Sequence, residues 1–400
     1  MPTRAVLGQS GDRVQDAAFV MLGLLPLGMA LASRSAPTFL VLAALVSLTG
    51  RLAEGHGRTL VMKLALLLSR PLVGVSVAFL AFAVLSLAWG HRPGVMLTIL
   101  AEFLVTAAAG LSLALTLPRQ MSKRLLLIAA ACFGLACAVI TIDLATGLAF
   151  RQAIGAKAFG FIHNRPAVTL VMVAWPIALL LWQQGYRGLT GGLAGVLVIV
   201  LALAESETAI LGFLAGALGL GLALASRRLA LACVGGTMLM VLAISPFLGV
   251  ISDRALTPAV LSALSSAHAR ERIEIWNGFG AVVRERPILG AGFGTGPVLS
   301  THPVAQEVPA ELRPALSGWH AHNGYLQIWT ELGLIGAALA AAMMALVLGA
   351  IARLPEPTFV AAMAVLGAGA AMILVGHGVW QGWWVGASVT SALWLTRRVR

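Results

Sequence analysis

The chain has 400 residues, of which 59% are hydrophobic and only 10% are charged, and its formal net charge is +12. A soluble globular domain carries about 25% charged residues, so this composition excludes a water-soluble protein and predicts a polytopic membrane protein. In a soluble protein the basic balance would suggest nucleic acid. Here it is expected to set membrane topology, because Lys and Arg concentrate in cytoplasmic loops, and no nucleic-acid partner is expected.

Twelve apolar stretches are candidates for membrane-spanning helices, since about 20 apolar residues cross a bilayer. The predicted spans are 16–33, 36–50, 72–89, 95–117, 124–149, 166–183, 190–204, 208–225, 229–250, 323–352, 358–376 and 379–396. The sequence therefore predicts an all-α integral membrane protein with about 12 transmembrane helices. Nine of them fall in residues 1–250, a large outer loop occupies 251–321, and three fall in 322–400.

The positions of the basic residues predict the orientation. With the N-terminus inside, 16 of the 27 Lys and Arg residues lie on the inner side, 5 lie in short outer loops, and 6 lie in the long loop. Long loops are translocated largely regardless of charge. We therefore expect a bacterial inner-membrane protein with both termini in the cytoplasm and the long loop in the periplasm. Because that face has no ATP, chemistry there must use a substrate that is already activated.

The long loop is predicted to contain an amphipathic helix. Ile273, Trp276 and Gly280 recur at helical spacing, and Pro287 is expected to stop the helix. One interpretation is an interfacial anchor whose Trp lies in the headgroup layer. The other is that Arg272 points inward and binds an anion, because its fork of donors suits phosphate oxygens.

A second polar segment precedes the sixth predicted span. It carries Arg151, Lys157 and Arg165 without any acid, and Pro166 is suited to the first turn of the next helix. This places Asn164 and Arg165 at a helix N-terminus, where free N–H groups favour anions. The cations could simply extend to the interface, but the histidine beside them favours a diphosphate site.

Two patterns that suggest cofactors do not fit on inspection. The stretch from Gly290 to Gly296 has Thr295 where a dinucleotide fingerprint needs its third glycine, and no Lys follows as in a P-loop. We expect a tight outer loop. His320 and His322 are two residues apart, which does not place them on one helix face. No metal site and no cofactor is predicted.

Two acids fall within predicted spans, and their roles are left open. Glu102 lies inside the fourth span and Asp143 lies near the outer end of the fifth. Acids within a membrane are candidates for function. The sequence identifies no partner for either one.

A motif begins at His322, where the sequence reads His-Asn, nine further residues, and then Gly333-x-x-Gly336. It resembles the signature of the O-antigen ligase and polymerase-like superfamily of bacterial membrane proteins. Ala337 departs from the pattern, since the family often has Gly, Thr or Tyr there, and little consequence is expected. The two glycines are expected to permit close helix packing, as small residues at this spacing do in lipid.

Three upstream stretches extend the resemblance. Arg272-Ile-Glu-Ile-Trp276 and Pro287-Ile-Leu-Gly-Ala-Gly-Phe-Gly294 are similar to the superfamily's large outer loop. Phe159-Gly-Phe-Ile-His-Asn-Arg-Pro166 resembles its segment before the sixth span. Together the motifs cover about residues 155–340, whereas the spans outside that range match only in number and character.

The resemblance implies an enzyme, a metal-independent and inverting glycosyltransferase. The implied donor is a glycan on undecaprenyl diphosphate, which is already energised. The implied acceptor is a sugar hydroxyl of lipid A-core, as in an O-antigen ligase of lipopolysaccharide biosynthesis. Membrane lipids are the remaining expected partners, and no cofactor is implied.

The resemblance also implies roles for individual residues. His322 matches the catalytic His, which could act as the base, while Arg272 matches the loop Arg and Arg165 the earlier Arg; both would hold the diphosphate. The chemistry agrees, because a His near pKa 6.5 can accept a proton and Arg stabilises a departing diphosphate. Alternatively, His322 could only cap or pack the tenth span. The further substrate-binding candidates are His163, Asn164, Trp276, His320, Asn323, Tyr325 and, in addition, Glu331.

Three other functions are alternatives to the ligase. A polymerase that extends the lipid-linked glycan commonly carries paired Arg-x10-Gly loops, but the match from Arg313 to Gly324 falls on the His motif and no convincing pair occurs. Some superfamily members transfer glycan to protein. A flippase or transporter would need charged groups along many spans, and the predicted spans are nearly free of charge. The sequence does not specify the sugars, the linkage or the oligomeric state.

Overall fold

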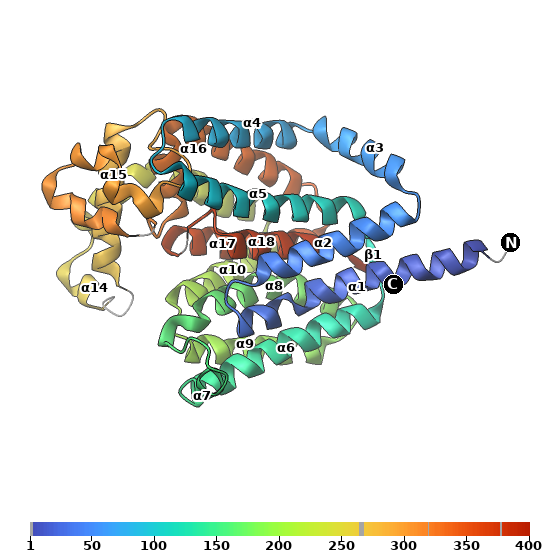
Figure 1. Ribbon diagram of the computed structural model, residues 1–400. Helices are drawn as coiled ribbons and strands as arrows, with labels where there is room; N and C mark the ends of the chain where they lie inside the picture. The colour runs from blue at the N-terminus through green and yellow to red at the C-terminus, as the bar shows by residue number, and fades with distance from the viewer. Residues whose placement is uncertain (1–2, 264–267, 319, 377) are drawn as a thin grey trace.

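The computed structural model describes residues 3–263, 268–318, 320–376 and 378–400, and almost all of them are helical. Figure 1 shows long helices that run side by side, with both chain termini at one end and the helices of the 251–321 loop at the other. The first part of the chain forms α1 (Thr3–Leu31), α2 (Ala36–Ala53), α3 (Gly57–Leu68), α4 (Pro71–Leu85), α5 (Pro93–Thr116), α6 (Lys123–Ala145) and α7 (Ala149–Ala153).

The middle of the chain continues the bundle and then leaves it for the long loop. Its helices are α8 (Asn164–Gln183), α9 (Arg187–Leu203), α10 (Glu207–Ala225), α11 (Arg227–Ala230), α12 (Gly236–Ile244), α13 (Leu248–Ala255), α14 (Pro258–Ala263) and α15 (Ala269–Glu285). Short turns of 3-10 or π helix are η1 (Ser86–Ala88), η2 (Gly160–His163), η3 (Leu231–Gly235), η4 (Ser245–Phe247), η6 (Gly296–Thr301), η7 (Pro303–Gln306) and η8 (Ala310–Ser317).

The chain ends with three more helices and a short strand pair. These are α16 (Gly324–Ile351), α17 (Glu356–Val375) and α18 (Gly382–Leu395). The strands β1 (Gln120–Met121) and β2 (Arg398–Val399) pair in parallel, which fixes the C-terminus beside the α5–α6 turn.

Every one of the twelve predicted spans falls on a helix or a run of helices. Ten candidate spans among the described residues are long and apolar enough to cross a membrane. The other two predicted spans correspond to α9, with 17 residues, and α18, with 14 residues. A helix of that latter length extends about 21 Å, which is less than the ~30 Å of a bilayer core. The predicted all-α membrane architecture is confirmed.

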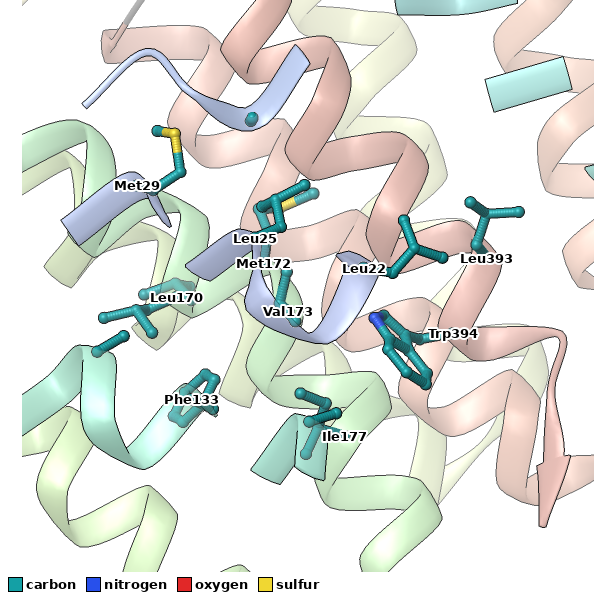
Figure 2. Packing of buried hydrophobic residues seen from close by; sticks show 14 of the residues in the cluster. Leu22, Leu25, Met29, Phe133, Leu170, Met172, Val173, Ile177, Leu393 and Trp394 are labelled. Carbon is teal, nitrogen blue, oxygen red and sulfur yellow. The ribbon is translucent and has the colours of Figure 1, made fainter. Parts of the chain in front are cut away.

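Helix α8 lies at the centre of the bundle. Two thirds of its span (67%) is buried within the protein, compared with 17% for the spans of α4 and α16. Figure 2 shows its Met172, Val173 and Ile177 packed among side chains of neighbouring helices, including Leu22 of α1 and Trp394 of α18. The N-terminus of α8 is therefore held rigidly, and Arg165 lies in its first turn.

Helices α10 and α17 pack closely because small residues face each other. A Cβ on Gly219 would lie 2.6 Å from the carbonyl oxygen of Met363, and one on Gly367 would lie 2.7 Å from that of Ala215. Such close backbone approach is typical of helix pairs in membranes. The packing brings the start of α10 beside the end of α17, where Gly376 follows the helix.

Helix α16 is interrupted at Gly333, whose φ of 59° lies in the left-handed region. A Cβ there would lie 2.4 Å from the backbone of Ile288. The glycine thus admits the backbone of the outer loop, whereas close packing between helices was expected. Leu334 donates its N–H to the carbonyl of Pro287 at 2.8 Å, so the loop replaces bonds that the helix loses at the break.

The predicted amphipathic helix is present as α15, and it ends at Glu285 just before Pro287. Its positions 278–283 are all buried. Phe279 and Val282 pack with Leu299 and Leu316 in a small core of the loop, and the half-buried Trp276 packs against that core. The second half of α15 is therefore enclosed by protein rather than laid along a headgroup layer, because η4, η8, α13 and α16 surround it.

Candidate functional site

A cavity of about 1240 Å³ lies among the turns at the loop end of the bundle. Segments far apart in sequence line it: the α1–α2 turn, the stretch before α8, the start of α10, the start of α15, the turn before α16 and the end of α17. The predicted site residues that line it are Asn164, Arg165, Arg272, His320 and His322.

His322 occupies a strained turn immediately before α16. Its φ is 47°, a left-handed conformation that costs a non-glycine residue on the order of 1–3 kcal/mol. Two contacts hold the turn: the N–H of His322 donates to Nδ1 of His320 at 3.1 Å, and Oδ1 of Asn323 accepts the N–H of Leu326 at 3.0 Å as the N-cap of α16. The imidazole of His322 is thereby directed to the cavity.

The surroundings of His322 favour its neutral form. Burial and the positive charge of Arg272 lower the pKa of His322, while a hydrogen bond to the backbone of Gly376 partly opposes them. A neutral imidazole has a free lone pair that can accept a proton. The ring centroid of His320 lies 4.2 Å away. The geometry therefore suits His322 to act as a general base.

Arg272 lies in the first turn of α15 and is half-buried. Burial lowers its pKa, and Glu207 and Glu271 act in the opposite direction, but a guanidinium remains charged. Within the described part of the chain, no hydrogen bond or ion pair occupies the guanidinium of Arg272. A half-buried cation without a fixed partner beside a cavity is available to an anionic ligand.

Arg165 approaches the cavity from the N-terminus of α8. Its guanidinium lies 5.8 Å from the ring centroid of Trp383 on α18, a cation–π arrangement that orients it. Arg34 of the α1–α2 turn lines the same cavity. No motif marked Arg34 in the sequence, where its only signal was its place in a short outer loop.

The cavity carries a net positive charge. Its cationic side chains are Arg34, Lys157, Arg165 and Arg272, and its acids are Glu205 and Glu207. Four positive against two negative charges leave +2 with the histidines neutral. The two acids come from the turn before α10 and its first residue, and no sequence pattern pointed to them.

His163 does not line the cavity but lies in a buried ion cluster. Its Nε2 is 2.7 Å from Oδ2 of Asp143, and Nε of Arg151 is 3.3 Å from the same oxygen. Arg151 also donates to the carbonyl of Ala30 at 2.8 Å. The cluster fastens the α7 segment to α6 and to the end of α1, which gives Asp143 a structural partner.

Three further predicted residues also lie outside the cavity lining. Asn323 is buried as the cap of α16. Tyr325 is buried and donates its hydroxyl to the carbonyl of Ala370 at 3.3 Å. Trp276 packs on the loop core. These side chains support the backbone around His322 and Arg272 rather than touching the cavity.

Glu331 binds the glycine-rich stretch from Gly290 to Gly296. Its carboxylate is fully buried and accepts the N–H groups of Gly294 and Gly296, together with Nε2 of Gln327 at 2.9 Å and Nε1 of Trp380 at 2.7 Å. The stretch therefore wraps a carboxylate of its own chain, and the predicted tight loop is confirmed.

The remaining intramembrane acid lies at the start of a helix. Oε1 of Glu102 accepts the N–H of Gly382 at 3.0 Å, at the first residue of α18. A carboxylate is favourable at a helix N-terminus. Among the described residues, no three His, Cys, Asp or Glu side chains are grouped to hold a metal ion.

Comparisons with known proteins agree with the motif-based resemblance. Residues 192–341 match the family model described as O-antigen ligase. The chain is also 24% identical over 243 residues to a protein of Rickettsia prowazekii (strain Madrid E) named "Putative polysaccharide ligase". That similarity covers 59% of this chain and 57% of the relative, so the chain spans little more than half of the relative's length. The region that matches the family model contains both Arg272 and His322.

Proposed function

We propose that this chain, of which residues 192–341 match the O-antigen ligase family model, transfers a glycan from undecaprenyl diphosphate to a sugar hydroxyl of lipid A-core. The match to this family model and the similarity to a polysaccharide ligase support a glycan-transferring membrane enzyme, and the identities of donor and acceptor are the proposal. The observation that carries it is one cavity that combines His322, whose pKa is lowered, with Arg272 and Arg165.

The reaction requires a base and a stabilised leaving group. The acceptor hydroxyl gives its proton to His322 as its oxygen attacks the anomeric carbon. The bond between that carbon and the diphosphate oxygen breaks, and its electron pair stays on the diphosphate. Attack opposite the leaving group inverts the anomeric centre, and the proton on His322 passes to solvent.

The cationic side chains are suited to the leaving group. Arg272 and Arg165 approach from different elements, α15 and α8, so that one diphosphate could contact both. Arg34 and Lys157 add positive charge from two further segments. The net charge of +2 complements a doubly charged diphosphate diester, and fixed cations stabilise the charge that develops as the bond breaks.

The arrangement of the chain supports a location at the outer face of a bacterial inner membrane. The cavity is built from turns at the end opposite to both termini (Figure 1). The bias of Lys and Arg towards the terminal side supports termini in the cytoplasm. The cavity would then open to the periplasm, where a preformed lipid-linked donor is the available source of energy.

One experiment separates this function from its nearest alternative, a polymerase. Purified protein in lipid nanodiscs is given an undecaprenyl-diphosphate-linked glycan with and without lipid A-core. We expect product on the core and none on the lipid carrier. A longer lipid-linked glycan formed in the absence of core would replace the ligase with a polymerase, and no transfer in either arm would reject both.

A further inference from the structure

An exposed aromatic pair forms part of the cavity wall on the side of the loop before α8. Phe159 and Phe161 line the cavity, and their ring centroids are 4.4 Å apart with planes tilted by 41°. Their exposed fractions are 36% and 63%, so both rings offer a face to a ligand. Neither ring has a role in the chemistry assigned to His322 and Arg272.

A carboxylate lies against the residue between the two rings. A Cβ built on Gly160, the residue between the two rings, would lie 2.6 Å from Oε2 of Glu205. The absence of a side chain at Gly160 leaves room for the carboxylate to lie on the backbone there, and a Cβ would displace it. Glu205 also lines the cavity, and an ionised carboxylate is a hydrogen-bond acceptor with two oxygens.

The segment that carries the aromatic pair is anchored through His163. Phe161 is two residues from His163, which is fixed at 2.7 Å by Asp143, and η2 carries both Phe161 and His163. The first turn of α8 follows at once with Arg165. The backbone that carries Phe161 is thus fixed next to a cation of the proposed diphosphate site.

We propose that Phe159, Phe161 and Glu205 form a saccharide-binding subsite that holds one pyranose unit. A pyranose presents a face of C–H groups and an edge of hydroxyl groups. The exposed rings match the apolar face, and the Glu205 carboxylate accepts hydrogen bonds from the hydroxyls. If the pair faced lipid, the neighbouring carboxyl group of Glu205 would lie in hydrocarbon, where an acidic side chain is costly.

This proposal rests on the proposed function and names a place for its sugar. The sugar could come from either of two sources. One is the first unit of the donor glycan, which is linked to the diphosphate. The other is the acceptor saccharide, whose hydroxyl must reach His322 in the same cavity.

Equilibrium binding to the full-length protein in nanodiscs tests the subsite without turnover. The probes are bare undecaprenyl diphosphate, undecaprenyl-diphosphate-linked glycan, and the oligosaccharide released from lipid A-core. The variants are Glu205→Gln, Phe161→Ala and Gly160→Ala, the last of which displaces the carboxylate while keeping it. Matched controls are Glu274→Gln and Phe150→Ala, because Glu274 and Phe150 are also exposed and both lie outside the cavity lining.

We expect Glu205→Gln to raise the Kd of one glycan-bearing probe about ten-fold, as expected for loss of a hydrogen bond to a charged group. Phe161→Ala and Gly160→Ala should raise the Kd of that same probe, while the controls and the Kd of bare undecaprenyl diphosphate stay unchanged. An effect on the lipid-linked glycan assigns the subsite to the donor, and an effect on the core oligosaccharide assigns it to the acceptor.

Other outcomes overturn the subsite. The first is an unchanged Kd for both saccharide probes, and the second is that the wild-type protein binds no saccharide. The third is that Phe161→Ala raises the Kd while Glu205→Gln does not, which would make the rings a membrane contact. The proposed function has its own indicator in these data. If the wild-type protein does not bind bare undecaprenyl diphosphate, the diphosphate donor fails, whereas failure of the subsite alone leaves that binding intact.

Discussion

Two histidine–arginine clusters lie at the loop end of this molecule, and they differ in what surrounds them. His163 and Arg151 share the carboxylate of Asp143, and all three side chains are almost completely buried. His322 and Arg272 are both half-buried on the wall of a large cavity. In the first cluster the chain supplies its own counter-charge, whereas in the second no ion pair of the described residues holds Arg272, and Glu207 and Glu271 act on it only through space.

The difference separates a structural brace from a candidate catalytic site. A buried charge needs a partner, so Asp143 makes the first cluster stable and closes it to ligands. In the second cluster, the positive charge of Arg272 disfavours protonation of His322, and His322 keeps a left-handed backbone conformation that is strained for a residue other than glycine. An incoming diphosphate would supply the missing negative charge.

The largest effect that would sharpen the comparison is expected from His322→Ala. Loss of a general base lowers transfer by about 10²–10⁴-fold, and because His322 is only half-buried, the thermal unfolding midpoint should change little. Transfer is measured with the lipid-linked glycan and lipid A-core. His56→Ala is the control, since His56 lies on the surface at the N-cap of α3. Wild-type transfer by a folded His322→Ala protein would remove His322 from the chemistry.

The opposite pattern is expected from Asp143→Ala. It leaves Arg151 and His163 buried without their carboxylate, and breaking a buried pair costs about 3–5 kcal/mol of unfolding free energy. Thermal unfolding in detergent should show a clearly lowered midpoint, while transfer per folded molecule falls far less than in His322→Ala. Asp253→Ala provides the control on an exposed acid of α13. A normal midpoint together with lost transfer would move this cluster into the active site and break the comparison.

Much of the fold could be predicted from sequence because hydropathy alone determines where membrane helices form. All twelve predicted spans fall on helices, and α15 was marked by its periodicity and by Pro287. The break at Gly333 could not be predicted in the same way. It depends on the approach of Ile288, which is distant in sequence and comes close only in the folded chain.

The site residues that belong to sequence motifs could be predicted, and the others could not. Arg165, Arg272 and His322 belong to motifs, and the structure brings all three to one cavity. Arg34 and Glu205 lie in ordinary turns whose meeting depends on helix packing. The motif containing Arg165 also contains His163, yet the two side chains diverge because Asp143, twenty positions earlier, binds the histidine.

The smallest expected effect is a shift of the pH profile, and it tests whether Arg272 acts on His322 through space. Burial and the charge of Arg272 lower the pKa of His322. The neutral base therefore persists below the ordinary His pKa, and kcat/KM should fall only as the pH drops through that lowered value. In Arg272→Ala the charge is gone, the pKa of His322 rises, and the acidic limb of the profile should move to higher pH. Arg272→Lys keeps the charge and should leave the acidic limb in place, although transfer at the plateau falls because an ammonium lacks the bidentate fork.

Arg92→Ala is the control, because Arg92 is exposed and lies outside the cavity lining. It should change neither the position of the acidic limb nor transfer at the plateau. If both Arg272 variants retain the wild-type limb, the limb does not report His322 beside Arg272, and the electrostatic contrast with the Asp143 cluster loses its functional meaning.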